Sequence, residues 1–150
     1  MSAEDRISQY LTTVRSTVTP TAAVERVESV FTELGLPASR QAEGDVWEIP
    51  TDVGSITAGL DEDQEILTVW QLIHPIQEPP KKRADYLWAL LSMNMSATGA
   101  WFAIHEVGEG RSAERWVVIV ARLAVPTLDK GDLALALESL FRLSKIYDTE

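Results

Sequence analysis

Two histidines are the side chains best suited to acid–base or metal chemistry, because the chain contains no cysteine. His74 and His105 each lie near the end of an apolar, strand-like segment. Neither belongs to a metal-ligand spacing such as HxH or HExxH, so the sequence predicts no metal site. We expect both to be partly solvated residues at strand ends. The alternative is that one of them acts as a pH switch, because histidine can change its charge at mildly acidic pH.

Carboxylates cluster in one place, the segment DEDQE at residues 61–65. The spacing superficially resembles a calcium loop. However, no glycine stands at the required position and no glutamate closes a twelve-residue loop. We therefore interpret the segment as a solvated hairpin turn.

The remaining reactive residue types do not converge on a catalytic motif. The serines show no G-x-S-x-G elbow, and the glycines form no Walker or dinucleotide-binding loop. The sequence therefore predicts no catalytic residues, no cofactor and no enzymatic activity. Its one basic cluster, residues 81–83, is interpreted as the solvated first turn of a helix, with a contact to a small anion or phosphate as the alternative.

The charge balance argues against nucleic acid as a partner. The 150-residue chain has a formal net charge of −10. Residues 1–80 hold 14 acidic and 4 basic residues, whereas residues 81–150 hold 9 of each. An acidic chain repels the phosphate backbone, so direct nucleic-acid binding is disfavoured.

Length and termini predict one domain over residues 1–150, with residues 1–18 as an N-terminal helical extension. The N-terminal residues are polar and mixed in charge, which is not typical of a signal peptide. No apolar run approaches the roughly 18 residues that a membrane span needs. Together with the absence of cysteine, these features predict a cytoplasmic protein without a membrane partner.

Hydrophobic periodicity predicts an α+β fold with five antiparallel strands. Helical spacing occurs in four segments, and strand-like segments join through short turns, the first of them around Pro50. Thr127 is expected to cap the last helix. The expected helices cover residues 4–16, 19–34, 80–95 and 127–147, and the expected strands lie within residues 45–73, 100–107 and 115–123.

Two of these strands do not alternate between apolar and polar residues. Both faces are apolar in the segments 65–74 and 115–123. Helices on one side of the sheet can cover only one of these two faces. Either the strands are buried on both sides within one chain, or another protomer, a partner or the N-terminal helix covers the second face. Tryptophan is enriched at interfaces, although it is also a large core residue. The candidate protein-interface residues are Trp70, Leu72, His74, Trp101 and Trp116.

Four features of the sequence together resemble those of a known family. They are a helix with paired leucines that ends in asparagine, a glycine before an aromatic strand, an apolar strand ending in Arg-Leu, and a proline-containing joint before the last helix. The residues concerned are Leu90, Leu91, Asn94, Gly99, Trp101, Phe102, Arg122, Leu123 and the segment from Pro126 to Tyr147. With these features the sequence resembles the YbjN family of bacterial proteins, over roughly residues 22–148 and best from residue 65 onward.

This resemblance implies a fold like that of type III secretion chaperones, a five-stranded antiparallel sheet in the order α-β-β-β-α-β-β-α. The order read from periodicity matches it, with one extra N-terminal helix. The resemblance further implies a small, acidic, often dimeric and non-catalytic protein that binds other proteins. It offers no catalytic residues to carry over.

Two hypotheses about function follow. The first is a non-catalytic, chaperone-like adaptor or regulatory protein that acts as a homodimer and binds a protein client. The alternative is a regulatory domain that senses a small ligand. Its pocket would be lined by tryptophan and histidine, with help from residues 81–83.

Overall fold

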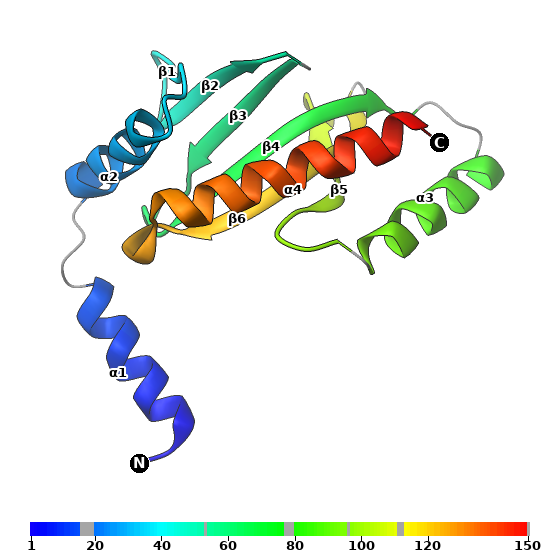
Figure 1. The fold of residues 1–150 in the computed structure, drawn as a ribbon. Coiled ribbons are helices and arrows are strands. Elements are labelled where there is room, and N and C mark those ends of the chain that lie inside the picture. The colour runs from blue at the N-terminus through cyan, green and yellow to red at the C-terminus, as the bar shows by residue number, and fades with distance from the viewer. Residues whose placement is uncertain (16–19, 53, 77–79, 96, 111–112, 150) are drawn as a thin grey trace. The chain divides into compact units, whose positions relative to one another are not determined.

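The computed structural model describes residues 1–15, 20–52, 54–76, 80–95, 97–110 and 113–149. The fold is α+β, and its strands form one antiparallel sheet in the order β1-β2-β3-β4-β6-β5 (Figure 1). The elements along the chain are α1 (Ala3–Arg15), α2 (Pro20–Glu33), β1 (Ser39–Arg40), β2 (Val46–Thr51), β3 (Gly54–Leu60), β4 (Ile66–Pro75), α3 (Pro80–Asn94), β5 (Trp101–Val107), β6 (Glu114–Ala124), the 3₁₀ turn η2 (Val125–Thr127) and α4 (Lys130–Thr149).

The chain divides into two compact units. The first comprises residues 1–68 and 122–134, and the second comprises residues 69–121 and 135–150. Strands β4 and β6 and helix α4 contribute residues to both units. The acidic charge belongs almost entirely to the first unit, since the second holds eight Asp or Glu against seven Lys or Arg.

In the first unit, helix α2 packs an apolar face against β2. Phe31 and Trp47 meet edge to face, with ring centroids 5.8 Å apart. The helix ends in a Schellman motif: the amides of Gly35 and Leu36 donate to the carbonyls of Thr32 and Phe31, and Gly35 has a φ of +67°. The buried apolar residues of this unit are Ala23, Val27, Val30, Phe31, Trp47, Ile49, Ile56, Ala58, Leu67, Val125, Leu128 and Leu133.

The acidic segment at residues 61–65 forms the turn between β3 and β4, as predicted. The carboxylate of Asp61 accepts hydrogen bonds from the amides of Glu65, at 2.9 Å, and Ile66, at 3.2 Å. The Oδ1 atom of Asp61 thereby closes the turn. Gln64 takes the left-handed conformation that the turn needs, with a φ of +60°.

The second unit is built on the β5–β6 hairpin, in which Phe102 pairs with Ile119 and Ile104 pairs with Val117. Gly99 leads into β5 with a φ of +82°, and a Cβ placed there would lie 2.9 Å from Ser139 Oγ of α4. The buried apolar residues of this unit are Val69, Leu90, Ala100, Phe102, Val117, Val118, Ile119, Val120, Ala121, Ala136, Leu137, Leu140 and Leu143.

Three details differ from the expectations. The sheet has six strands rather than five, because the two-residue strand β1 pairs with β2. Pro50 lies inside β2, paired with Ser55, so the first turn comes later than expected. Helix α4 begins at Lys130, where the carboxylate of Asp129 accepts from the amide of Asp132 at 2.8 Å, and Asp129 rather than Thr127 is therefore the cap.

The doubly apolar pattern of β6 is explained within the chain. Every residue from Val117 to Ala121 is at most 9% exposed, so both faces of this strand are covered. Its pattern therefore does not identify a surface that needs a partner. The large apolar side chains that stay exposed in the second unit lie mainly on α3 and β5.

Candidate functional site

Helix α3 exposes an apolar row, here called the α3 stripe, that consists of Ala84, Trp88, Leu91 and Met95. Trp88 is 75% exposed, Leu91 64% and Met95, in the turn after the helix, 89%. Residues spaced by four, three and four positions fall on one face of a helix. Isolated exposed apolar residues are ordinary, but a contiguous row of large ones marks a surface for interaction.

The C-terminal end of α3 is fixed to β5 by Asn94. The Asn94 carboxamide accepts from the Phe102 amide at 2.7 Å and donates to the Phe102 carbonyl at 3.0 Å. β5 is an edge strand, so these are main-chain groups that no neighbouring strand satisfies. Asn94 thus takes the place of a strand at this point and holds the α3 stripe beside β5.

A shallow apolar groove runs between α3 and β5. Its volume is about 250 Å³. Leu91 of the α3 stripe and Ile104 of β5, itself 43% exposed, both line it. The groove therefore extends the apolar surface from the helix onto the edge strand. The complete lining is Leu87, Leu90, Leu91, Asn94, Phe102, Ala103 and Ile104.

The first half of α3 is held by a cluster of His74, Tyr86 and Tyr147 from β4, α3 and α4. Tyr86 Oη lies 2.9 Å from His74 Nε2 and 2.6 Å from Tyr147 Oη, which also hydrogen-bonds to His74 Nε2. His74 Nδ1 lies 2.8 Å from the Pro75 carbonyl, which can only accept, so this nitrogen carries a proton. All three rings are half-buried, and the cluster joins three elements rather than forming an open reactive site.

The five predicted interface residues do not share one surface. In the β5–β6 register, Trp101 pairs with Val120 and Trp116 pairs with His105, so both tryptophans lie on one face of the hairpin. Phe102 lies on the opposite face, where its ring contacts Tyr147. His74 bonds to the same tyrosine and so belongs to the helical side.

The exposure of the predicted residues differs as well. Trp101 is 38% and Leu72 is 43% exposed, whereas Trp70 and Trp116 are half-buried. The most exposed tryptophan is Trp88, which was not among the predicted interface residues.

The sequence contains a signal for the α3 stripe. The adjacent leucines of α3 differ in exposure, since Leu90 is 4% exposed and Leu91 is 64% exposed. No charged residue occurs between Asp85 and Glu106, so the helix is apolar on nearly all sides after its first turns. A helix of this kind has more apolar surface than one sheet can cover.

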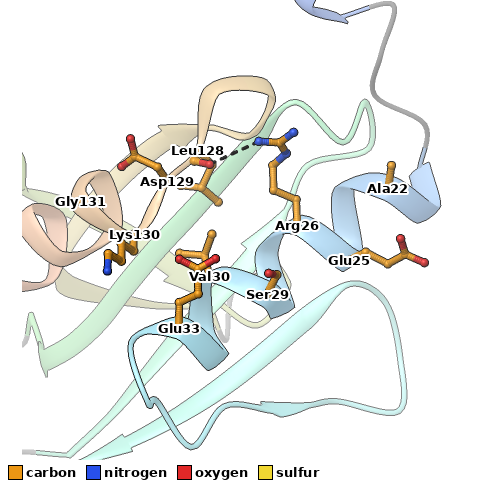
Figure 2. A pocket seen from close by; sticks show the side chains of 10 residues that line it. All are labelled: Ala22, Glu25, Arg26, Ser29, Val30, Glu33, Leu128, Asp129, Lys130 and Gly131. Carbon is orange, nitrogen blue, oxygen red and sulfur yellow. Dashed lines mark hydrogen bonds between the residues drawn. The ribbon is translucent and has the colours of Figure 1, made fainter.

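The first unit holds a different pocket, of about 770 Å³, along one face of α2 (Figure 2). Arg26 of α2 donates to the Leu128 carbonyl at 3.5 Å, and Glu33 and Lys130 contribute charges of both signs. It contains neither the tryptophan nor the histidine that the ligand-sensing hypothesis expected. The lining residues are Ala22, Glu25, Arg26, Ser29, Val30, Glu33, Leu128, Asp129, Lys130 and Gly131.

Within the described part of the chain, no three His, Asp or Glu side chains are grouped so that they could hold a metal ion. In the same residues, no helix is both long and apolar enough to cross a membrane.

Solved structures of known proteins have this fold. A chain of the HopA1–SchA chaperone–effector complex aligns with a TM-score of 0.61 at 14% identity, covering 89% of this chain and 99% of that one. YbjN from E. coli, a candidate transcription regulator, aligns with a TM-score of 0.57 at 12% identity, covering 81% and 86%. A chain from the structure of the Yersinia pestis type III secretion chaperone SycH with a fragment of YscM2 aligns at 0.54 and 16% identity, covering 83% and 98%.

The chain therefore has the fold shared by YbjN and type III secretion chaperones, as the sequence predicted. These structural neighbours are described as chaperones and a regulator, not as enzymes. No family model and no curated protein sequence matches the chain.

Proposed function

We propose that this protein is a non-catalytic, chaperone-like adaptor that acts as a homodimer and binds a protein client. The observation that carries the proposal is the exposed α3 stripe with its adjoining groove, an apolar surface on a chain of net charge −10. Burying such a surface against protein removes large apolar side chains from water, which stabilises a complex by about 25 cal/mol per Å² of apolar area.

The distribution of charge supports association through the second unit. That unit is close to neutral by composition, so two copies can approach through it with little local repulsion. The strongly acidic first unit opposes non-specific association and favours solubility. The chain thus combines an apolar surface that favours association with an acidic unit that disfavours non-specific contacts.

The proposed client-binding residues are Trp101 and Trp116, which lie on one face of the β5–β6 hairpin, and Trp70 and Leu72 of β4. Trp101 and Leu72 are exposed, and the other two indoles are half-buried and reach the surface. Partly exposed tryptophans supply large contact areas at low entropic cost. We do not place His74 on this surface, since its ring is bonded to Tyr86 and Tyr147.

The test is affinity purification of the tagged chain from its own cells at physiological salt, read by mass spectrometry and by sedimentation velocity. We expect one stoichiometric protein partner and a dimeric mass for the purified chain. Trp101→Ala should remove the partner and leave the dimer. A partner retained equally by Trp101→Ala would contradict the proposed client surface, and a pure, partner-free preparation would contradict the adaptor function.

A matched pair of variants assigns the dimer to the α3 stripe. Leu91 and Leu135 both lie on helices of the second unit, and they are 64% and 65% exposed. Leu91→Glu should give a monomer, because it places a charge in the proposed interface. Leu135→Glu should stay dimeric. Equal behaviour of the two variants would show that the stripe is not where the chain associates.

A further inference from the structure

We propose that His74, Tyr86 and Tyr147 form a metal site that binds one iron(III) ion through His74 Nε2 and the two tyrosine Oη atoms. The three residues come from β4, α3 and α4, and all of them belong to the second compact unit. The inference goes beyond the adaptor function and does not depend on it. It rests on the number of hydrogens in the cluster, the state of the imidazole and the spacing of the three polar atoms.

The cluster has fewer hydrogens than contacts. Tyr86 Oη lies 2.9 Å from His74 Nε2 and 2.6 Å from Tyr147 Oη, which also contacts His74 Nε2. The Nδ1 proton faces the Pro75 carbonyl, so in the neutral cluster only the two hydroxyl hydrogens can lie between these atoms. Two hydrogens cannot fill three contacts, and Nε2 has a single lone pair for two hydroxyl groups. A cation bound by the three atoms uses the lone pairs of all of them at once.

The imidazole of His74 is in the state that a metal ligand needs. Nδ1 lies 2.8 Å from the Pro75 carbonyl oxygen, which can only accept, so Nδ1 carries the proton and Nε2 presents its lone pair. Metal-binding histidines almost always donate their other ring N–H to a backbone carbonyl, a carboxylate or water, which fixes the orientation of the ring. The backbone of β4 therefore holds this ring as a metal site would hold it.

The distances between the polar atoms indicate a coordination geometry. Two ligands that meet a metal ion at a right angle, with bonds of about 2.0–2.1 Å, lie about 2.8–2.9 Å apart, whereas tetrahedral ligands lie about 3.3 Å apart. The separations of 2.9 Å and 2.6 Å fit the right angle. They favour an octahedral ion with three protein ligands on one face over tetrahedral zinc, and the remaining positions are left to water.

The chemistry of the ligands favours iron(III) among octahedral ions. Phenolate oxygen is a hard, anionic ligand, and imidazole suits iron, whereas calcium and magnesium prefer oxygen ligands alone. On binding, each tyrosine hydroxyl releases its proton, so that one iron(III) ion and two phenol groups give one bis-phenolate complex and two protons. The two phenolates offset two of the three positive charges of the ion.

The tertiary structure brings these ligands together from distant parts of the chain. His74 and Tyr86 are 12 residues apart, and Tyr86 and Tyr147 are 61 residues apart. The sequence predicted no metal site because the motifs considered there contain ligands at short, regular spacing. A site made of one histidine and two tyrosines has no such spacing.

The test is titration of the full chain, first freed of metal with a chelator, with iron(III) nitrilotriacetate. We expect one iron per chain after gel filtration, measured by mass spectrometry, and a visible tyrosinate-to-iron charge-transfer band. Resonance Raman spectra excited in that band should show tyrosinate vibrations, which identify the ligands without any substitution. Zinc(II), titrated in the same way, should bind more weakly.

Each ligand has a matched control, since the chain contains three tyrosines and two histidines. Tyr147→Phe and His74→Gln should abolish the band and weaken iron binding by more than the roughly 10–100-fold that follows loss of a ligand's hydrogen-bond partner. Tyr10→Phe and His105→Gln change exposed residues of α1 and β5, and these variants should bind iron as the unsubstituted chain does. Circular dichroism confirms that each variant is folded.

Three outcomes would overturn the inference. Iron retained equally by Tyr147→Phe would show adventitious binding at other acidic groups. A chain that takes up no iron would leave the cluster as a hydrogen-bonded joint between three elements. Tighter binding of zinc(II) than of iron(III) would contradict the right-angle geometry. The adaptor function is tested separately by partner capture, so its failure and the failure of the metal site are distinguishable.

Discussion

At the scale of single residues, Asn94 links the local sequence to the exposed surface. Its carboxamide supplies one donor and one acceptor to the two main-chain groups of Phe102 that face away from β6. An amide side chain can do this because it has the same groups as a peptide bond. The asparagine at the end of this helix therefore positions α3 on the edge strand.

Asn94→Ala should lower the free energy of unfolding by about 1–3 kcal/mol, because two hydrogen bonds to a partly buried strand are lost. Urea denaturation measures the change. Ser92→Ala is the control, since the Ser92 hydroxyl only bonds back to the Trp88 carbonyl on an exposed helix face. Equal and small effects of the two substitutions would show that Asn94 does not hold α3.

The tyrosines of the other attachment make a second prediction at this scale. Tyr147→Phe keeps the ring contact with Phe102, centroids 5.9 Å apart, and removes the hydroxyl that bonds to Tyr86 and His74. We expect a loss of about 1–2 kcal/mol in the free energy of unfolding. We also expect faster amide exchange in the first half of α3. Unchanged exchange there would contradict a role for the cluster in anchoring the helix.

At the scale of elements, Gly99 sets how β5 enters the sheet beside α4. Its φ of +82° is a conformation that side chains disfavour, and its missing Cβ leaves room for Ser139 of α4. Both requirements act at one position, which is why the joint between α3 and β5 contains glycine.

Gly99→Ala should destabilise the protein by about 1–4 kcal/mol, since a backbone strain of about 1–3 kcal/mol is joined by a new Cβ that lies 2.9 Å from Ser139 Oγ and forces that side chain to shift. Gly110→Ala is the matched control in the same unit. Gly110 has a φ of +66°, but a Cβ there meets nothing within 4 Å. Thermal unfolding measures both, and equal losses would show that the contact with Ser139 is unimportant.

Helix α1 begins with a capping box. The Ser2 hydroxyl accepts from the Asp5 amide at 3.1 Å, and the Asp5 carboxylate accepts from the Ser2 hydroxyl and amide at 2.8 and 3.1 Å. The side-chain hydrogen bond from Ser2, followed by the backbone one, lowers the pKa of Asp5 below its ordinary value of 3.8. The cap therefore stabilises the helix above the unfolded-state pKa, and this contribution is lost as pH falls through the lower folded-state value.

NMR titration of the Asp5 carboxyl group in the full chain should give a pKa below 3.8. Ser2→Ala should raise it, because the hydroxyl that donates to the carboxylate is removed while the backbone amide remains. The protection factors of the α1 amides, which allow for the intrinsic pH dependence of exchange, should fall at acidic pH in the unsubstituted chain. An Asp5 pKa that does not respond to Ser2→Ala would contradict the cap.

At the scale of the whole molecule, association through apolar residues and a net charge of −10 have opposite effects. The charge repels a second copy at long range, and salt screens that repulsion with a Debye length of about 10 Å at 0.1 M. Apolar contacts between the stripes are not screened. The balance of these two terms can be measured directly.

The dissociation constant of the dimer should stay constant or fall several-fold as sodium chloride rises from about 20 to 500 mM, since screening removes repulsion between two acidic chains. Sedimentation equilibrium over this range measures it. A dimer that weakens steeply with salt would instead be held by ion pairs, which the stripe does not contain.

Much of the fold could be predicted from the sequence, because periodicity and turn chemistry are local. The end of α2 at Gly35 and the turn at Asp61 appear where their residue types require them. The two-residue strand β1 could not be predicted, since it has no apolar pattern and exists only through pairing with β2.

The candidate site was predicted less well. Trp101 was expected at an interface and is partly exposed, but Trp88 was missed. For the strand β6 the sequence left open whether its second face is covered within the chain or from outside, and the strand is buried within the chain. In each case the sequence shows that the residue is apolar. It does not show whether another part of the folded chain covers that residue.

The sequence by itself determined the order of the elements and the concentration of acidic charge in residues 1–80, because these depend on spacing and composition. Only the tertiary structure decided which apolar residues remain exposed. Leu90 and Leu91 are adjacent and identical in type, yet Leu90 is buried and Leu91 is 64% exposed. That difference arises when Asn94 and Tyr86 fix the rotation of α3 about its axis, and both use partners distant along the chain.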